Sequence, residues 1–304
     1  MWLELPVLRC FWLKLLTIAI IIQRNHVTQA SAQTRPGHLP DFNSPPLAEV
    51  VLGVQFSAPL GFQVIRSKEV WDLFLHDYPE SQEQPPLPPS FETFGLPFQQ
   101  ASTPKIQFYE GIVHPRFLFI NPSGDQLIQF QSDRLMHNWK KLGNGTNHYP
   151  RYESMVSAFR NEFVQLQNYM KSLSDQTQNL SINQCEINYI NHIDINRGEG
   201  HNFSDWLKFI SLDNNTADDF FMAFRQVIRG SGGKPQGRFY AETTLGLFPD
   251  GKEKIVFSLS VKGAPQENDI TSALSFLDLG RDVIVNKFAE LTTSKAHQHW
   301  ERVK

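Results

Sequence analysis

The stretch Gln126–Lys141 contains the residues of this sequence that are best equipped for chemistry. Its first half alternates apolar and polar side chains, which predicts a β-strand. Its second half brings together Arg134, His137, Asn138 and Trp139. A guanidinium can hold a phosphate or carboxylate, and an indole can stack on a base, so these residues are candidates for binding an anionic or planar ligand. The alternative is the end of a strand whose Trp lies in the core and whose charges are solvated.

A second group of candidates comes from the following half of the chain. Glu186 and His192 share one face of a predicted strand, and the spacing between them corresponds to about 20 Å at the rise of a strand. Two groups so far apart need partners from other strands before they can act as an acid–base pair. We expect the remaining candidates, Tyr152 and Tyr189, to line a polar and aromatic groove together with Trp139 and His192.

No motif in the sequence identifies a catalytic centre. It contains no P-loop, no HExxH zinc motif, no nucleophile elbow and no dinucleotide-binding fingerprint. Ser231-Gly-Gly-Lys234 lacks the spacing of a P-loop and predicts a turn, and His297 and His299 are more typical of a solvated terminus than of a metal site. We therefore predict no catalytic residue, no metal site and no cofactor.

Composition and charge place the chain among globular proteins. Hydrophobic residues make up 40% of it, and the net charge of −3 argues against a strongly basic nucleic-acid-binding surface over the whole molecule. Its two cysteines, Cys10 and Cys185, have no zinc-site spacing and fit a reducing compartment. We therefore expect a cytoplasmic protein. The alternative is an exported or membrane-associated protein, if residues 1–32 form a signal segment.

Residues 1–35 form an N-terminal extension whose composition differs from the rest. Three interpretations stay open: a start placed too far upstream, a secretory signal or anchor with Ala30-Ser31-Ala32 as its cleavage site, and an ordinary helix. The apolar run Phe11–Ile22 is interrupted by Lys14 and is shorter than the roughly 20 residues that a membrane span needs. We therefore expect no stable transmembrane anchor.

The remaining chain predicts two units of the same element order, at residues 36–178 and 179–304. Each runs from a strand through a shorter helix and several antiparallel strands to a long amphipathic helix, expected at Tyr152–Leu173 and Ile270–Leu291. Asp269 is the expected cap of the second helix. These patterns predict an α+β fold with two antiparallel sheets, each covered by a long helix, in an arrangement like TATA-binding-protein or helix-grip folds.

Several smaller elements complete the prediction. Shorter helices are expected at Ser67–Tyr78 and Phe203–Ile210, and a strand at Lys105–Glu110. The proline-rich segment 79–104 predicts a stiff connector lying over the surface, and the alternative is a proline-rich ligand for an aromatic groove.

A set of short motifs resembles a sporadically distributed bacterial family of about 250–260 residues. The resemblance covers roughly residues 34–302, and members of that family typically begin near the position of Thr34. It implies no particular activity, and its patchy distribution is similar to that of accessory or defence genes. The motifs are Leu39-Pro-Asp-Phe42, Glu49–Phe56, Gln84–Pro89, His137-Asn-Trp-Lys140, Tyr149–Glu153, Asn183–Glu186, Tyr189–Ile193 and Leu277–Arg281.

These features favour a non-enzymatic binding or regulatory protein, antitoxin-like or defence-associated, whose main ligand is a protein partner. A small anionic ligand or nucleic acid is the other ligand class that the residues suit. The alternative function is an enzyme acting on nucleotide or RNA phosphates, with His137 or His192 as general base beside Arg134. A third hypothesis is a structural subunit that oligomerises through its sheets. Convergence of His137, Arg134 and either Glu186 or His192 in one pocket would favour the enzyme, and their scatter over opposite sheet faces would count against it.

Overall fold

The structure is a computed structural model that describes residues 36–59, 61–95, 114–143, 145, 147–173, 179–196, 198, 200–211, 217–248 and 250–304. The chain divides into two compact units, Met1–Pro36 and Gly37–Lys304, and every element below belongs to the second. The predictions for residues 1–35 and for a strand at Lys105–Glu110 lie outside the described residues.

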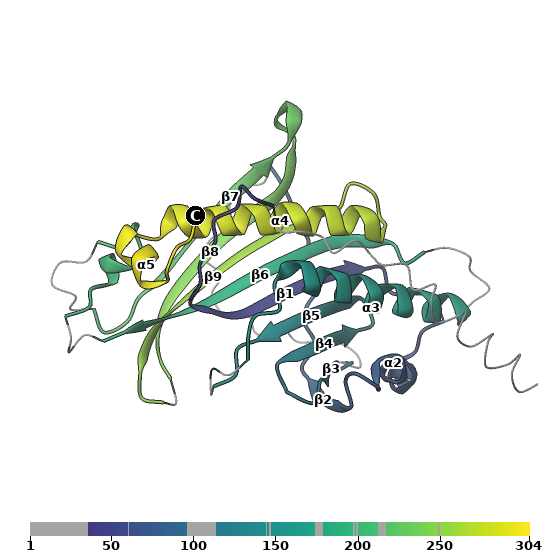
Figure 1. The fold of residues 1–304 in the computed structure, drawn as a ribbon. Coiled ribbons are helices and arrows are strands. Elements are labelled where there is room, and N and C mark those ends of the chain that lie inside the picture. The colour runs from purple at the N-terminus through teal and green to yellow at the C-terminus, as the bar shows by residue number, and fades with distance from the viewer. Residues whose placement is uncertain are drawn as a thin grey trace, which may run out of the picture. The chain divides into compact units, whose positions relative to one another are not determined.

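The described strands form one antiparallel sheet in the order β2-β3-β4-β5-β1-β6-β9-β8-β7 (Figure 1). The expectation of two sheets, each with its own helix, is wrong. Strand β1 pairs with β5 on one side and with β6 on the other, so the strands of both halves of the chain join edge to edge. The strands are β1 (Leu47–Phe56), β2 (Glu80–Gln84), β3 (Arg116–Ile120), β4 (Gln126–Gln131), β5 (Arg134–Lys140), β6 (Ile182–Ile195), β7 (Phe221–Arg229), β8 (Pro235–Leu247) and β9 (Glu253–Gly263).

The two long helices lie side by side on the same face of this sheet (Figure 1). Helix α3 packs against β5 and β1, and α4 packs against β6 and β9. We call this side the helix face and the opposite side the open face. The helices are α2 (Ser67–Phe74), α3 (Tyr152–Ser172), α4 (Ile270–Leu291) and α5 (Ser294–His299), with single 3-10 turns at Val64–Arg66, Phe203–Asp205 and Ser231–Gly233.

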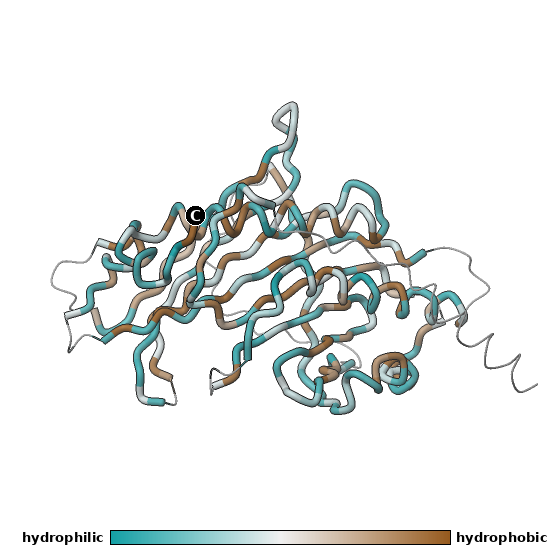
Figure 2. The backbone as a smooth tube through the Cα atoms, in the orientation of Figure 1, coloured by the Kyte–Doolittle hydropathy of each residue, from teal (hydrophilic) through white to brown (hydrophobic). Residues whose placement is uncertain are grey.

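The main core fills the space between the helix face and the two long helices. Its side chains include Leu52 from β1, Phe163 from α3 and Phe257 from β9, all fully buried. Helix α4 approaches β6 so closely that a Cβ at position 280 would lie 2.4 Å from Ile187 Cγ2, which explains the glycine there. Figure 2 shows apolar residues along the central strands, where the alternation of a strand directs them to this face.

The local predictions agree with the structure better than the overall one. Both long helices occur where the apolar periodicity predicts them, and the Asp269 side chain caps α4 by accepting from the Ser272 amide. Of the predicted helix at Phe203–Ile210, only a 3-10 turn at Phe203–Asp205 forms, so that prediction is wrong. The helix predicted at Ser67–Tyr78 does form, but it ends at Phe74. The proline-rich connector begins with an unexpected edge strand, β2. Among the described residues, every helix is too short or too polar to cross a membrane.

Candidate functional site

A row of buried polar side chains crosses the open face of the sheet. Strand register places Gln131 of β4 beside Arg134 of β5, Arg134 beside Gln55 of β1, and Gln55 beside Gln184 of β6. All four are buried although they lie on the face without helices. We call these residues the glutamine row. Because neighbouring strands lie about 4.8 Å apart, the row presents amide and guanidinium groups at regular intervals across four strands.

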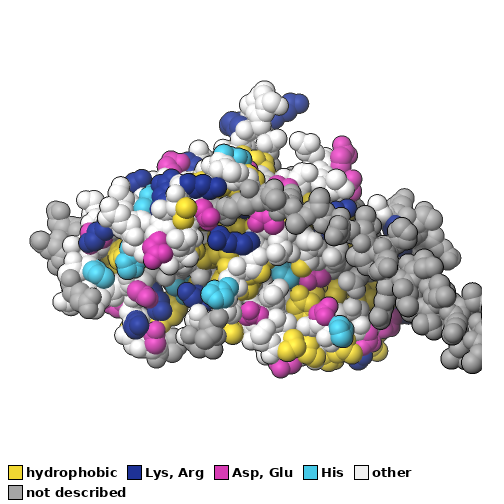
Figure 3. Space-filling view, viewed as in Figure 1, with side chains coloured by type: hydrophobic (Ala, Val, Ile, Leu, Met, Phe, Trp, Pro, Cys, Tyr) yellow, Lys and Arg dark blue, Asp and Glu magenta, His cyan; other side chains and the backbone are white. Residues whose placement is uncertain are grey.

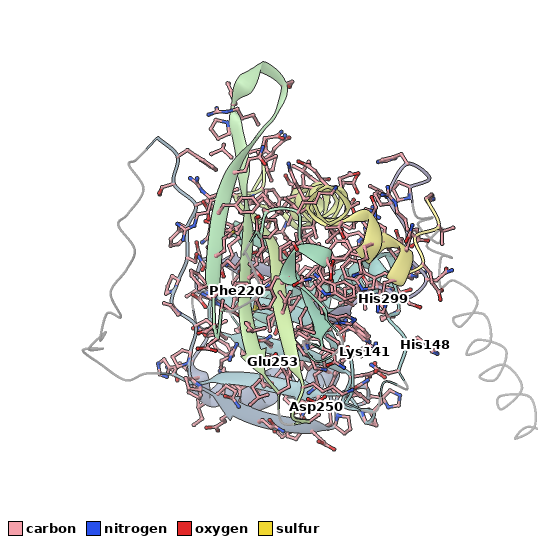
Figure 4. The ribbon with its side chains drawn as sticks, turned by 90° about the vertical axis from the view of Figure 1, so that its left-hand side faces the viewer. Lys141, His148, Phe220, Asp250, Glu253 and His299 are labelled. Carbon is pink, nitrogen blue, oxygen red and sulfur yellow. The ribbon has the colours of Figure 1, made fainter. Side chains whose placement is uncertain are left out.

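The segment Leu87–Thr93 covers this row, and we call it the strap. Its backbone amides at Leu87 and Ser90 donate to Gln131 Oε1 at 2.9 Å and to Gln55 Oε1 at 3.0 Å. Gln131 Nε2 and Arg134 Nη2 donate in return to the carbonyls of Leu87 and Pro88. In Figure 4 this coil runs along the side of the sheet away from α4. The strap is therefore bound mainly through its backbone.

At the far end of the strap, the carboxylate of Glu92 binds Arg238 on β8. Glu92 Oε2 accepts from Arg238 Nε at 2.8 Å, and Arg238 Nη2 also donates to the carbonyl of Thr93 at 2.9 Å. The Tyr240 hydroxyl donates to the other Glu92 oxygen, and the guanidinium lies 5.3 Å from the centre of the Phe94 ring. Burial and the bond to Glu92 raise the pKa of Tyr240, so its hydroxyl stays a donor.

A small hollow lies between the strap and the sheet. Its volume is about 310 Å³ including the part open to solvent, and Gly53 forms part of its floor. Ser90, Arg134 and Gln184 line it, together with the Glu186–Lys262 ion pair at 2.9 Å. Among the described residues Gln184 Nε2 has no hydrogen-bond partner, although it is buried here. The hollow therefore has an unused donor and mixed charges, but it is small for an organic substrate.

Four predicted site residues lie on the helix face and are buried. His137 Nδ1 lies 2.9 Å from Glu162 Oε1 on α3, and the Trp139 ring packs 5.1 Å from that of Tyr149. The Tyr189 hydroxyl lies 3.2 Å from the Tyr149 hydroxyl. The fourth, Tyr152, is 2% exposed, and its hydroxyl donates to Asp278 on α4. Of these contacts, His137–Glu162 joins β5 to α3, and Tyr152–Asp278 joins α3 to α4.

The other four predicted residues lie on the open face. Arg134 is part of the glutamine row, and Glu186 lines the hollow. Asn138 donates to Glu49 and accepts from Gln129, and His192 packs edge-on against Phe248 at 4.8 Å. The candidates therefore divide between opposite faces, so Trp139, Tyr152, Tyr189 and His192 do not line one groove. For the same reason His137 does not meet Arg134.

The surroundings of His192 predict how its pKa is shifted, and a titration can test this. Burial, and then the charge of Lys254, lower its pKa below the ordinary 6.5. Folding therefore disfavours the protonated ring, so stability falls as the pH drops below 6.5 toward the folded-state pKa. We expect a titration midpoint below 6.5 by NMR, raised part of the way back in Lys254→Met, because burial has the larger effect. A midpoint at or above 6.5 in the wild type would contradict this description.

No pattern in the sequence predicts the contacts of the strap. Gln55, Gln131 and Gln184 are unremarkable polar positions in strands, and they meet only because of strand pairing between distant segments. Glu92 lies in the proline-rich connector, and Arg238 in a strand with no motif. One signal in the sequence was available. Side chains alternate along a strand, so if Arg134–Lys140 is a strand, residues 134 and 137 must point to opposite faces.

Comparison with known proteins adds no further constraint on this site. Among the described residues, no group of three or more His, Cys, Asp or Glu side chains is placed to hold a metal ion. The resemblance to a bacterial family stays an expectation from the sequence. Searches of protein-family models, of curated proteins and of solved structures find no match to this chain.

Proposed function

We propose that this protein is a non-enzymatic binding protein that takes up an extended, acidic segment of a protein partner on its open face. The strap is the observation that carries this proposal. Side chains of β4, β5 and β1 already bind an extended backbone there, and β8 binds the carboxylate that follows it. A partner segment of similar backbone geometry with one acidic residue would satisfy the same donors and acceptors. The strap would then regulate access by occupying the site itself.

The contacts support binding rather than catalysis. The glutamine row contacts main-chain atoms, which every peptide has, so it supplies affinity for extended chains without requiring a given side chain. Arg238 and Tyr240 add a requirement for a carboxylate. The alternative phosphate-processing enzyme lacks such support. One candidate base, His137, is fully buried on the other face, bound to Glu162. The other, His192, shares the open face with Arg134 but lies eight residues along β6 from Gln184 of the glutamine row, about 26 Å at the rise of a strand.

A peptide in trans tests the proposal. In Glu92→Lys, the repulsion from Arg238 should release the strap, which hydrogen exchange at residues 87–93 would report. A fluorescent peptide of residues 85–95 in the wild-type sequence should then bind this variant and should not bind the wild-type protein, whose site is occupied. Losing a charge-assisted hydrogen bond costs about 1.5–3 kcal/mol, so the peptide carrying Glu92→Gln should bind roughly tenfold to a hundredfold more weakly.

The matched control is Tyr240→Phe combined with Glu92→Lys, which keeps the repulsion from Arg238 but removes one side-chain donor to the carboxylate, so it should bind the acidic peptide more weakly while keeping the fold. Two results would overturn the proposal. In the first, hydrogen exchange at residues 87–93 of Glu92→Lys is as slow as in the wild type, which would make the strap a fixed cover. In the second, the strap is released but the acidic peptide does not bind.

A further inference from the structure

Strand β7 is a long sheet edge with exposed apolar side chains, and the described part of the chain leaves it unpaired on its outer side. It pairs with β8 on its inner side over Phe221–Arg229, and most of its side chains are exposed. Phe221 is 70% exposed and Met222 is 37% exposed. Natural proteins shorten or charge such edges, because free backbone groups recruit other strands. The opposite edge, β2, follows that rule, since its five residues Glu80–Gln84 are all polar.

We propose that β7 pairs with β7 of a second copy of this chain, antiparallel and about a two-fold axis, to give one sheet across a homodimer. The occupant is a second copy because the edge is complementary to itself. Asp218 and Asp219 lie just before the strand, and Arg225 and Arg229 lie toward its end. Antiparallel pairing places the acidic start of each copy near the basic end of the other, whereas parallel pairing would align like charges.

Symmetry and charge together favour one register. A two-fold axis perpendicular to the sheet keeps both open faces on the same side, so opposed residues must have the same parity. Centring the pairing on Phe224 sets Asp219 opposite Arg229 and Phe221 opposite Val227 of the other copy. A register centred on Arg225 would oppose two like charges, which is unfavourable. Phe224 itself packs against Phe209 and Phe239 on the helix face, so its position is well fixed.

The hairpin leaves room for this contact. Figure 1 shows β7 and β8 extending beyond α4, and Figure 3 shows basic side chains at the projecting tip, where Arg229 and Lys234 are exposed. The pairing is independent of the strap, whose contacts lie on β4, β5, β1, β6 and β8. Failure of one proposal therefore leaves the other standing.

Light scattering coupled to size exclusion tests the dimer. The full chain should be dimeric at micromolar concentration, and Phe221→Glu should weaken the dimer because it places a charge opposite Val227. The matched control is Leu247→Glu, which changes a side chain that is 75% exposed on β8, away from the edge. It should leave the dimer intact. A monomeric wild type, or equal effects of the two substitutions, would overturn the proposal.

Charge reversal tests the register. Asp219→Arg alone and Arg229→Asp alone each set like charges at both ends of the interface and should weaken association about tenfold. Mixing the two variants should restore it, because every Arg then faces an Asp. Asp218→Arg is the control, since in this register residue 218 faces Gly230. Arg229 also donates to the Gly233 carbonyl at 2.8 Å, so the rescue in the mixture separates pairing from a local effect on the hairpin. Absence of rescue would overturn the register.

Discussion

Replacing Glu162 with alanine is expected to lower the free energy of unfolding by about 3–5 kcal/mol, because it removes the shared acceptor of a buried network. The two Glu162 oxygens lie 2.9 and 3.0 Å from His137 Nδ1, and the Tyr78 hydroxyl donates to one of them at 2.9 Å. Burial and the carboxylate raise the pKa of Tyr78, so its hydroxyl remains a donor. The substitution would leave this hydroxyl and the imidazole unpaired in the core.

The surroundings of His137 offer no substitute for the lost carboxylate. Its side chain is fully buried, and among the described residues Nε2 already has no hydrogen-bond partner. A buried polar group that loses its partner costs about 1–3 kcal/mol, and here two groups do so. Glu162→Gln keeps the volume and one acceptor, so about half of the loss is expected from it.

Denaturant unfolding followed by circular dichroism measures these differences. Gln165→Ala is the control on the same helix, because Gln165 is exposed, and its effect should stay within about 0.5 kcal/mol. If the free energy of unfolding of Glu162→Ala lies within about 1 kcal/mol of the wild-type value, the network does not stabilise the attachment of α3 to β5 as described.

The sequence predicted individual elements because their causes are local. Apolar residues at helical spacing define α3 and α4, and the Asp269 cap depends on an amide three residues away. The joining of both halves into one sheet depends on β1 pairing with β6, and these strands are separated by more than a hundred residues. Alternation tells which side chains share a face, but it does not say which edges meet.

The candidate site shows the same division between local and distant causes. Arg134 and Glu186 were singled out by residue type, and both lie at the open face near the strap. Trp139 and Tyr152 were singled out by the same reasoning but are core residues, because strand and helix periodicity turn them toward the helix face. Glu92 could not be found at all, since its role depends on an arginine 146 positions further along the chain.

Arg281 offers the second large effect, because one buried guanidinium connects the two long helices. Arg281 is 3% exposed, and its Nη1 donates to Glu153 of α3 at 3.0 Å. The guanidinium carbon lies 4.6 Å from the centre of the Tyr152 ring. Nε lies 2.7 Å from Asp282 Oδ1 as an ion pair whose geometry is not that of a hydrogen bond. The residue therefore combines charge, hydrogen bonding and stacking.

We expect Arg281→Ala to lower the free energy of unfolding by about 2–3 kcal/mol, less than the cost of breaking a fully buried pair, because Asp282 is partly exposed and solvent screens it. Arg281→Lys should recover only part of this, since an ammonium lacks the planar fork that stacks on Tyr152 while binding Glu153. Lys287→Ala is the control on the same helix, because it removes an exposed pair with Glu290, and its effect should be at most about 0.5 kcal/mol. Equal losses of unfolding free energy in Arg281→Ala and Lys287→Ala would mean that apolar packing alone holds α3 against α4. Full recovery of stability in Arg281→Lys would mean that charge, and not stacking, makes the contact.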